Sequence, residues 1–298
     1  MIGILISTFE RYERLAHFTE EQIRRRWASP PPLFFSGLLR PEKKYLTFKS
    51  DMRDWMGVTL EAVEELRRRR FTHIYLILDD HPPMGPCHEI FLNEQLPALA
   101  LKLDATYIGL LGYGQHRSAH GVILRKENGF LEQCSPNYQW KFSLHPGLWN
   151  LEALQVLLEQ RRSIYPEGKR TAWNFERHRD QLDDPLLESL LRRCFRVSGK
   201  HFLKKPLSMK SQIMQEAAER FVIDVTLYLS KKKGGLQARQ DLEKKLLWHY
   251  GHYVGPYPLF WSGLMQQGNP HHGFEKWLHA CGDRALQQEW KKISFSFL

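Results

Sequence analysis

Apolar and polar positions follow two different periods along the first part of the chain. Residues 1–8 form a short apolar run typical of a strand, and residues 10–27 carry apolar positions among charges at the spacing of a surface helix. The same patterns predict further strands at 33–37, 74–78, 104–111 and 119–125, and helices at 55–70 and 89–102. This order is βαβαβαββ, which predicts an α/β sandwich with a mainly parallel sheet.

The stretch THIYLILDDH at residues 72–81 is the strongest strand signal. Its apolar run at 74–78 shows no alternation, as burial on both faces of a sheet requires, and it ends at Asp79 and Asp80. Open α/β sheets bind ligands outside the carboxyl ends of their strands, where carboxylates can hold a divalent cation against a phosphorylated ligand. The alternative is that both residues only cap a turn before the two following prolines.

The stretch TAWNFERHRD at residues 171–180 contains the second candidate catalytic residue. Glu176 follows an aromatic pair, Trp173 and Phe175, that brackets Asn174. An acid held beside aromatic rings can be partly desolvated, which raises its pKa toward the value that a general base needs. In the alternative, Glu176 is a surface residue in the first turn of the next helix, where the helix dipole favours an acid.

In the rest of the chain the pattern predicts one more strand followed by a helix, and then only helices. Residues 140–144 are expected to form a strand, which His145 and Pro146 end, and residues 149–160 a helix. Helices are also expected at 185–195, at 211–230, at 237–250 and near the C-terminus. We therefore predict an α/β domain over residues 1–180 and a basic α-helical region over 181–298 that packs on it. The segments PPLFFSGLL at 31–39 and YPLFWSGLM at 257–265 look alike, but one short match does not predict a structural repeat.

Composition places the chain among folded globular proteins. Of its 298 residues 42% are hydrophobic and 12% aromatic, which is enough for a core. The four cysteines lack the spacing of metal or redox motifs, and the N-terminus lacks the features of a signal peptide. No uncharged apolar stretch reaches the length of about 18 residues that a membrane span needs. We expect a cytoplasmic protein.

The net charge of +10 is unevenly distributed. Residues 1–180 hold 25 Lys and Arg against 22 Asp and Glu, whereas residues 181–298 hold 18 against 11. A basic surface suits phospholipid, acidic polysaccharide or nucleic acid. Because the basic residues are dispersed and no nucleic-acid motif is present, we expect an anionic membrane surface or a glycan as the partner, and no nucleic acid.

Four short motifs occur in an order and at separations that resemble a known family. They are Asp54 and Trp55 at a helix start, LILDD at a strand end, FSLHPGLW, and AWNFE. Together they resemble a group of bacterial glycosyltransferase-like proteins of the GT-A fold, over about residues 1–180. The chain differs from that pattern at His81, where the family tends to have an aromatic residue, at His145, which replaces a glutamine, and at Ala172, which replaces a proline.

The resemblance implies a fold, a reaction and roles for particular residues. The fold would be GT-A-like, a Rossmann-like mainly parallel sheet between helices, followed by the C-terminal helical region. Asp79 and Asp80 would correspond to the acidic motif that binds the metal and the nucleotide sugar, Ser7 and Thr8 would lie beside the nucleotide base, and Glu176 would face the acceptor.

The implied reaction moves a sugar from a nucleotide-diphosphate sugar, of the UDP or GDP type, to a hydroxyl group of a glycan or lipid-linked acceptor. A Mg or Mn ion would assist departure of the diphosphate. A single base with in-line attack would invert the anomeric configuration, and a retaining course is the alternative that the sequence leaves open. Bacterial surface polysaccharide or glycoconjugate synthesis, at the inner face of the membrane, is the setting that the resemblance implies.

Three other functions fit the sequence less well. A non-catalytic binding protein would have the same sheet but would catalyse no sugar transfer. A nucleotidyltransferase should have a loop rich in glycine and basic residues after the first strand, and ISTFERYER contains no glycine. A nucleic-acid binder would show salt-dependent binding to oligonucleotides.

Overall fold

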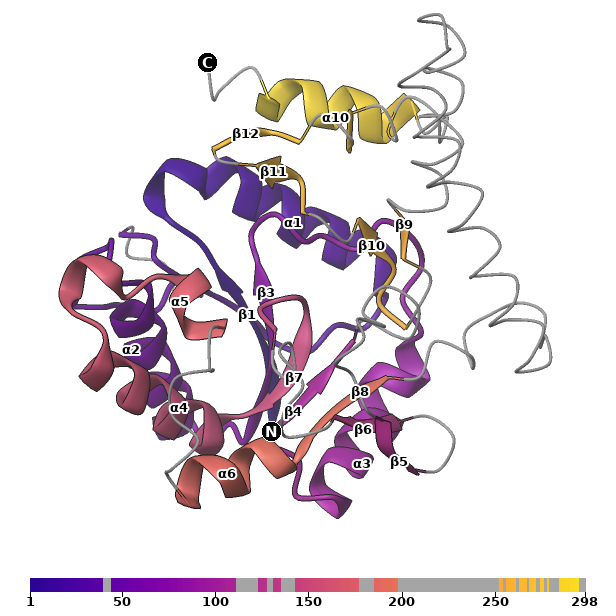
Figure 1. Ribbon diagram of the computed structural model, residues 1–298. Helices are drawn as coiled ribbons and strands as arrows, with labels where there is room; N and C mark the ends of the chain where they lie inside the picture. The colour runs from indigo at the N-terminus through magenta and orange to yellow at the C-terminus, as the bar shows by residue number, and fades with distance from the viewer. Residues whose placement is uncertain are drawn as a thin grey trace, which may run out of the picture.

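The computed structural model describes residues 1–39, 44–110, 123–127, 131–134, 143–176 and 185–197, together with parts of 252–294. In these parts the chain forms an eight-stranded sheet of order β2-β1-β3-β7-β4-β8-β6-β5, with helices on both faces (Figure 1). The α/β class with a Rossmann-like sheet flanked by helices is therefore confirmed.

Most of the regular structure belongs to this sheet and its covering helices. The strands of the sheet are β1 (Ile2–Ser7), β2 (Leu33–Ser36), β3 (His73–Leu78), β4 (Tyr107–Gly109), β5 (Ile123–Glu127), β6 (Leu131–Cys134), β7 (Gly147–Asn150) and β8 (Cys194–Val197). The longer helices are α1 (Glu13–Arg26), α2 (Trp55–Arg68), α3 (Leu96–Lys102), α4 (Leu151–Ile164), α5 (Ala172–Glu176), α6 (Pro185–Arg192) and α10 (Arg284–Ser294). Short helical turns are η1 (Glu10–Tyr12), η2 (Phe91–Gln95) and η3 (Glu167–Lys169), and two small hairpins join β9 (His252–Tyr253) to β10 (Leu259–Phe260) and β11 (Met265–Gln266) to β12 (Asn269–Pro270).

The sheet is mixed, and its parallel part carries the first strands. β1 pairs in parallel with both β2 and β3, and β4 pairs in parallel with β8. β7 lies antiparallel between β3 and β4, and β6 and β5 continue antiparallel beyond β8. β3 thus has a neighbour on each side and is buried over most of its length, as its unbroken apolar run predicts.

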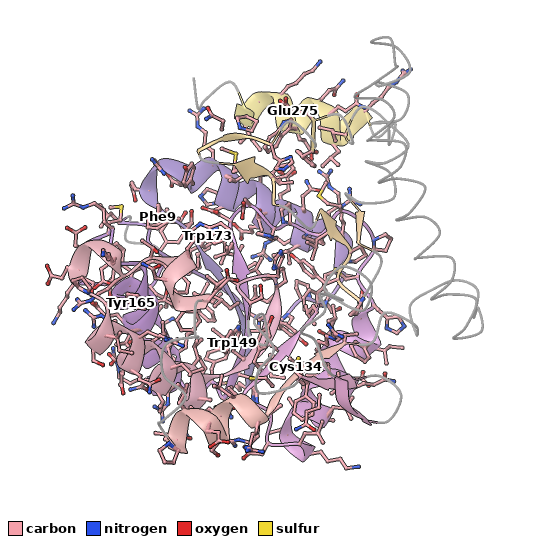
Figure 2. All side chains as sticks on the ribbon, viewed as in Figure 1. Phe9, Cys134, Trp149, Tyr165, Trp173 and Glu275 are labelled. Carbon is pink, nitrogen blue, oxygen red and sulfur yellow. The ribbon has the colours of Figure 1, made fainter. Side chains whose placement is uncertain are left out.

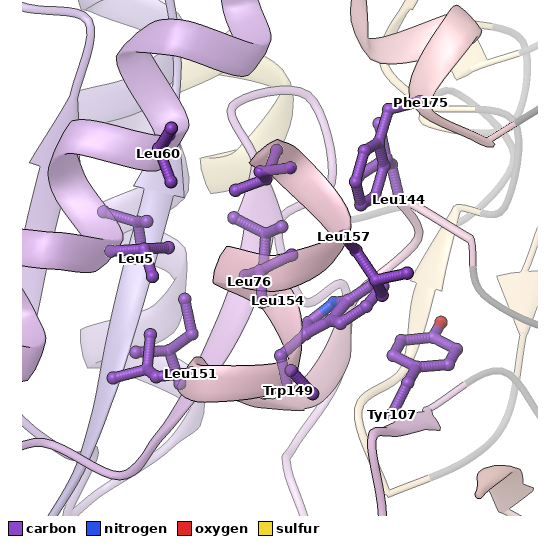
Figure 3. Close-up of a cluster of buried hydrophobic side chains, with 14 of the residues drawn as sticks. Leu5, Leu60, Leu76, Tyr107, Leu144, Trp149, Leu151, Leu154, Leu157 and Phe175 are labelled. Atoms are coloured by element: carbon purple, nitrogen blue, oxygen red, sulfur yellow. The ribbon is translucent and has the colours of Figure 1, made fainter. Parts of the chain in front are cut away.

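Side chains of the central strands alternate between two buried clusters. Leu5 of β1 and Leu76 of β3 point to the face covered by α2 and α4, and Figure 3 shows them with Trp149 of β7 around Leu154 and Leu157 of α4. The next residues along these strands, among them Ile4, Ile6, Tyr75 and Ile77, belong to the cluster on the opposite face, with residues of α1 and α3. Burial on both faces fixes the register of these strands.

β7 corrects one of the predictions from sequence. Ser143 and Leu144, the described end of the strand expected at 140–144, are not in a strand, and residues 140–142 lie outside the described part. The strand occurs instead at Gly147–Asn150 and includes Trp149, which was expected to be helical. Helix α4 begins after Asn150, whose side chain accepts hydrogen bonds from the backbone N–H groups of Glu152 and Ala153 at 3.0 and 3.1 Å.

β8 corrects another. The helix expected at 185–195 ends at Arg192, and the residues that follow form β8 between β4 and β6. The sheet therefore extends past residue 180, where the sequence predicts the end of the α/β domain. The helices expected at 211–230 and 237–250 lie outside the described residues.

The last helix packs on the first. Trp290 of α10 lies against Phe18 of α1 and against Phe274, with ring centroids 6.0 and 4.9 Å apart. Leu15 and Leu264 belong to the same buried cluster. In the described part of the chain no helix is long and apolar enough to span a membrane.

Candidate functional site

The parallel pairing of β1 and β3 brings four predicted site residues to one edge of the sheet. Ser7 pairs with Leu78 at the ends of the two strands, and the backbone N–H of Asp79 donates to the carbonyl oxygen of Ser7 at 3.1 Å. Thr8 follows Ser7, and Asp80 follows Asp79, so both lie just beyond the strand ends. This is the carboxyl end of both strands, where open α/β sheets bind their ligands.

Asp79 is tied to the chain that leaves β1. The hydroxyl group of Thr8 donates to its carboxylate at 2.5 Å, and the hydroxyl group of Thr19 donates to its backbone carbonyl oxygen. Burial and the neighbouring charge of Asp80 raise the pKa of Asp79, and the bond from Thr8 and the charge of His81 offset part of this increase. A positive charge bound here would favour the ionised form.

Asp80 forms a close pair with the next residue. Its Oδ1 lies 2.7 Å from Nδ1 of His81, a buried side chain. Burial alone would lower the pKa of His81, but Asp80, through charge and hydrogen bond, together with Asp79 and Glu176 raises it. Nε2 of His81 has no hydrogen-bond partner among the described residues. The site thus contains a buried histidine whose protonated form is favoured by acids.

Glu176 lies at the end of α5 with 7% of its surface exposed. Its Oε1 accepts hydrogen bonds from the hydroxyl group of Ser143 at 2.9 Å and from the backbone N–H of Leu144 at 2.5 Å. Burial raises the pKa of Glu176, and these bonds and the charge of His81 offset part of the increase. The surface alternative from sequence is therefore wrong: this acid is buried and anchored.

A continuous series of contacts joins Glu176 to the acid pair. Ser143 bonds both to Glu176 and to Nδ1 of His145, at 2.7 Å. The ring of His145 meets the ring of His81 edge to face, with centroids 5.1 Å apart, and His81 bonds to Asp80. Residues from the ends of β3 and α5, and from the segment before β7, thus form one polar cluster.

Residues of two sequence motifs, Asp54–Trp55 and AWNFE at 172–176, pack next to this cluster. The indole N–H of Trp55 donates to the hydroxyl oxygen of Ser7 at 2.9 Å, and the Trp55 ring packs 5.5 Å from that of Phe175. Asp54 caps α2 through the N–H of Gly57 and forms ion pairs with Arg162 and Arg170. These contacts connect α2, α4 and α5.

Ser7 and Thr8 are both buried, and their hydroxyl groups are bonded to Trp55 and Asp79. Their role beside a nucleotide base stays a prediction. Trp173 of α5, in contrast, is 70% exposed (Figure 2), while Phe175 two residues later is fully buried (Figure 3).

The sequence did not indicate every residue at the site. Ser143 was expected in a strand, and Tyr257 and Leu264 were not predicted to be site residues. The Tyr257 hydroxyl donates to the carbonyl oxygen of His81 at 3.0 Å, and the N–H of Leu264 donates to that of Asp80 at 2.8 Å. The one sequence signal near these residues is the similarity of the segments at 31–39 and 257–265.

The acid pair fits a hard divalent cation that is shared with a phosphorylated ligand. Among the described residues, no group of three or more His, Cys, Asp and Glu side chains is arranged to hold a metal ion. Mg²⁺ commonly takes only one or two carboxylates from the protein and the rest from phosphates and water. Asp79 and Asp80 supply two carboxylates, and a cation bound to them would offset the burial and the charge of Asp80 that raise the pKa of Asp79.

Comparison with known proteins gives only a distant structural likeness. No protein family matches the sequence, and no curated protein does. A solved structure that matches is the crystal structure of S. aureus TarS 1-349, which is 10% identical, with 83% of this chain and 80% of that chain covered and a TM-score of 0.31. At this TM-score the likeness adds nothing to the fold class, which rests on the sheet topology itself.

Proposed function

We propose that this chain is a glycosyltransferase that moves a sugar from a nucleotide-diphosphate sugar, of the UDP or GDP type, to a hydroxyl group of an acceptor. The observation that carries the proposal is the series of contacts from Asp80 through His81, His145 and Ser143 to Glu176. The proposed transfer uses one acidic group at the leaving diphosphate and another at the acceptor hydroxyl, and the contact series has an acid at each of its two ends.

In the proposed reaction Asp79 and Asp80 would hold a Mg or Mn ion together with the donor. When bound, the ion neutralises the charge that develops on the leaving diphosphate. The acceptor oxygen forms a bond to the anomeric carbon, and the bond from that carbon to the diphosphate oxygen breaks, its electron pair leaving with the nucleoside diphosphate. The hydroxyl proton passes to Glu176. One base and in-line attack invert the configuration.

The environment of Glu176 supports its role as the base. Burial raises its pKa toward the working range of a general base, and the two hydrogen bonds to Oε1 fix the orientation of the carboxylate. Exposed Trp173 lies on the same short helix, so an acceptor could approach α5 from solvent. The net charge of +10 supports an acceptor that is a glycan or lipid-linked chain at an anionic membrane surface.

The test compares Glu176→Gln with the parent protein. A thermal-shift screen of UDP, GDP, CMP and dTDP sugars, with and without Mn²⁺, first identifies the donor, because a ligand that binds only the native state raises its stability. Glu176→Gln keeps an oxygen that can accept the bond from Leu144, so we expect donor binding close to that of the parent. Release of the nucleoside diphosphate in the presence of acceptor should fall roughly a hundredfold or more.

Glu167→Gln, which changes an exposed acid a few residues away, is the matched control and should transfer at the parent rate. Normal transfer by a well-folded Glu176→Gln would place the base elsewhere, with His145 the next candidate. Poor folding of that variant would instead mean that Glu176 is a structural anchor for the segment at 143–144.

A further inference from the structure

Two segments of similar sequence, PPLFFSGLL at 31–39 and YPLFWSGLM at 257–265, share two features at their described glycine and leucine. In each the glycine after serine has the left-handed conformation, with φ of +87° at Gly37 and +76° at Gly263. In each the leucine after this glycine is buried. We call Gly37–Leu38 the first SGL turn and Gly263–Leu264 the second SGL turn.

The first SGL turn lies against Thr8. The backbone N–H of Thr8 donates to the carbonyl oxygen of Ser36 at 3.2 Å. A Cβ atom at Gly37 would collide with the carbonyl oxygen of Thr8. The absence of a side chain at Gly37 therefore lets this turn approach the chain that leaves β1.

The second SGL turn lies against Asp80 and His81. The backbone N–H of Leu264 donates to the carbonyl oxygen of Asp80, and a Cβ atom at Gly263 would collide with Asp80 Oδ2 and lie 3.2 Å from Cε1 of His81. Just before this turn, Tyr257 donates to the carbonyl oxygen of His81 and the carbonyl oxygen of Pro258 accepts from Met84 at 2.6 Å. Much of the chain from 256 to 264 is thus bonded to the segment that follows β3.

Because Thr8 is bonded to Asp79, the first SGL turn adjoins the partner of Asp79, and the second adjoins Asp80 itself. We propose that Tyr257, Pro258 and the pair Gly263–Leu264 line one side of the donor site. Gly263 is a positioning residue in this proposal: because it has no side chain, the Asp80 carboxylate has room to lie against His81. The identity of the ligand, a nucleoside diphosphate with Mn²⁺, rests on the proposed function. The positioning of Asp80 rests on the geometry alone.

Gly268 is a control position, because it has a positive φ like Gly263 but has no contact with the acid pair. It has the same left-handed conformation, with φ of +84°, but a Cβ atom there would meet only the hydroxyl group of Tyr12, at 3.4 Å. Alanine at either position carries the backbone cost of a positive φ. Only alanine at Gly263 also displaces the carboxylate of Asp80.

The experiment follows the His81 ring and ligand binding in Gly263→Ala and Gly268→Ala. Histidine ring nitrogens are observed by NMR in protein labelled with ¹⁵N-histidine, and the His81 signals are assigned with His81→Gln. We expect Gly263→Ala to shift the His81 nitrogen signals and to weaken binding of Mn²⁺ with UDP or GDP roughly tenfold or more, the usual scale for loss of a supporting contact around a metal site. Gly268→Ala should leave both close to the parent.

His81 signals that stay at the parent position in Gly263→Ala would overturn the inference, whatever the binding result. A parent protein that binds neither UDP nor GDP would count against the proposed function, while the His81 signals would still decide the role of Gly263. If Gly263→Ala does not fold, Tyr257→Phe replaces it, since it keeps the ring and removes the hydroxyl group bonded to His81. Unchanged His81 signals in that variant would likewise overturn the inference.

Discussion

Burial and the neighbouring Asp80 raise the pKa of Asp79, so ionisation of this carboxyl group at neutral pH costs folding free energy. Asparagine has no charge and can still accept the bond from Thr8. We therefore expect Asp79→Asn to leave the melting temperature unchanged or to raise it, while binding of Mn²⁺ with UDP or GDP is lost. Differential scanning fluorimetry with and without the ligand measures both effects.

Glu64→Gln on the exposed side of α2 is the control for loss of a carboxylate, and it should bind like the parent. Asp80→Asn should also lose binding, since it weakens the pair with His81. Full ligand affinity in both aspartate variants would show that the acid pair does not hold the donor.

Glu20 shows the opposite electrostatic situation. Burial alone would raise the pKa of this side chain, but bonds with His17, Lys44 and Arg24 lower it to about 2, from an ordinary value of 4.5. The ionised form therefore stabilises the fold, fully above about pH 4.5, and this contribution is lost as the pH falls toward 2. Glu20→Gln should lower the free energy of unfolding by at most about 3 kcal/mol at pH 7, and by little near pH 2.

Urea unfolding at several pH values measures the effect, and Glu21→Gln serves as the control. Glu21 also pairs with an arginine, Arg25, but its side chain is 57% exposed, so its loss should cost less than about 1 kcal/mol. An equal cost of Glu20→Gln at pH 7 and at low pH would mean that Glu20 acts through packing and not through charge.

At the scale of elements, long periodic stretches were predictable from sequence and short strands were not. β1, β3, α1 and α2 appear close to where their patterns predict them, because each buries a face long enough to show its period. β7 and β8 have four residues each, and both adjoin a helix whose apolar spacing continues across them. Trp149 fits the pattern of α4, and Cys194 and Phe195 fit that of α6. Pairing with strands far away in sequence decides their conformation.

The candidate site divides in the same way. Acids at the end of a buried strand could be recognised from residues 74–80 alone, since strand ends in such sheets bind ligands. The partners of those acids could not. Glu176 meets Ser143 across 33 residues, and Tyr257 meets His81 across 176, contacts that only the tertiary fold creates. The sequence thus singled out the acids of the candidate site and, through the resemblance, His81 and His145, and the structure adds their contacts, Ser143 and the second SGL turn.

At the scale of the whole molecule, the last described helix, α10, packs on the first long helix, α1 (Figure 1). Glu289 of α10 bonds to Gln22 and Arg25 of α1, at 3.0 and 2.6 Å. The same buried cluster contains Trp290 and Leu264, so α10 adjoins the residue that follows Gly263. The packing of α10 on α1 therefore also supports Leu264 of the second SGL turn.

Trp290→Ala tests this support. Trp290 is 3% exposed and lies between Phe18 and Phe274, so its removal leaves a large cavity and should lower the free energy of unfolding by about 3–5 kcal/mol. Trp173→Ala, at a position that is 70% exposed, is the control and should change stability by less than about 0.5 kcal/mol. Because Leu264 shares the cluster, Trp290→Ala should also shift the NMR signals of His81. A folded Trp290→Ala with parent-like stability would mean that α10 does not contribute to the fold, and the second SGL turn would then have to be held by its own hydrogen bonds to Asp80 and His81.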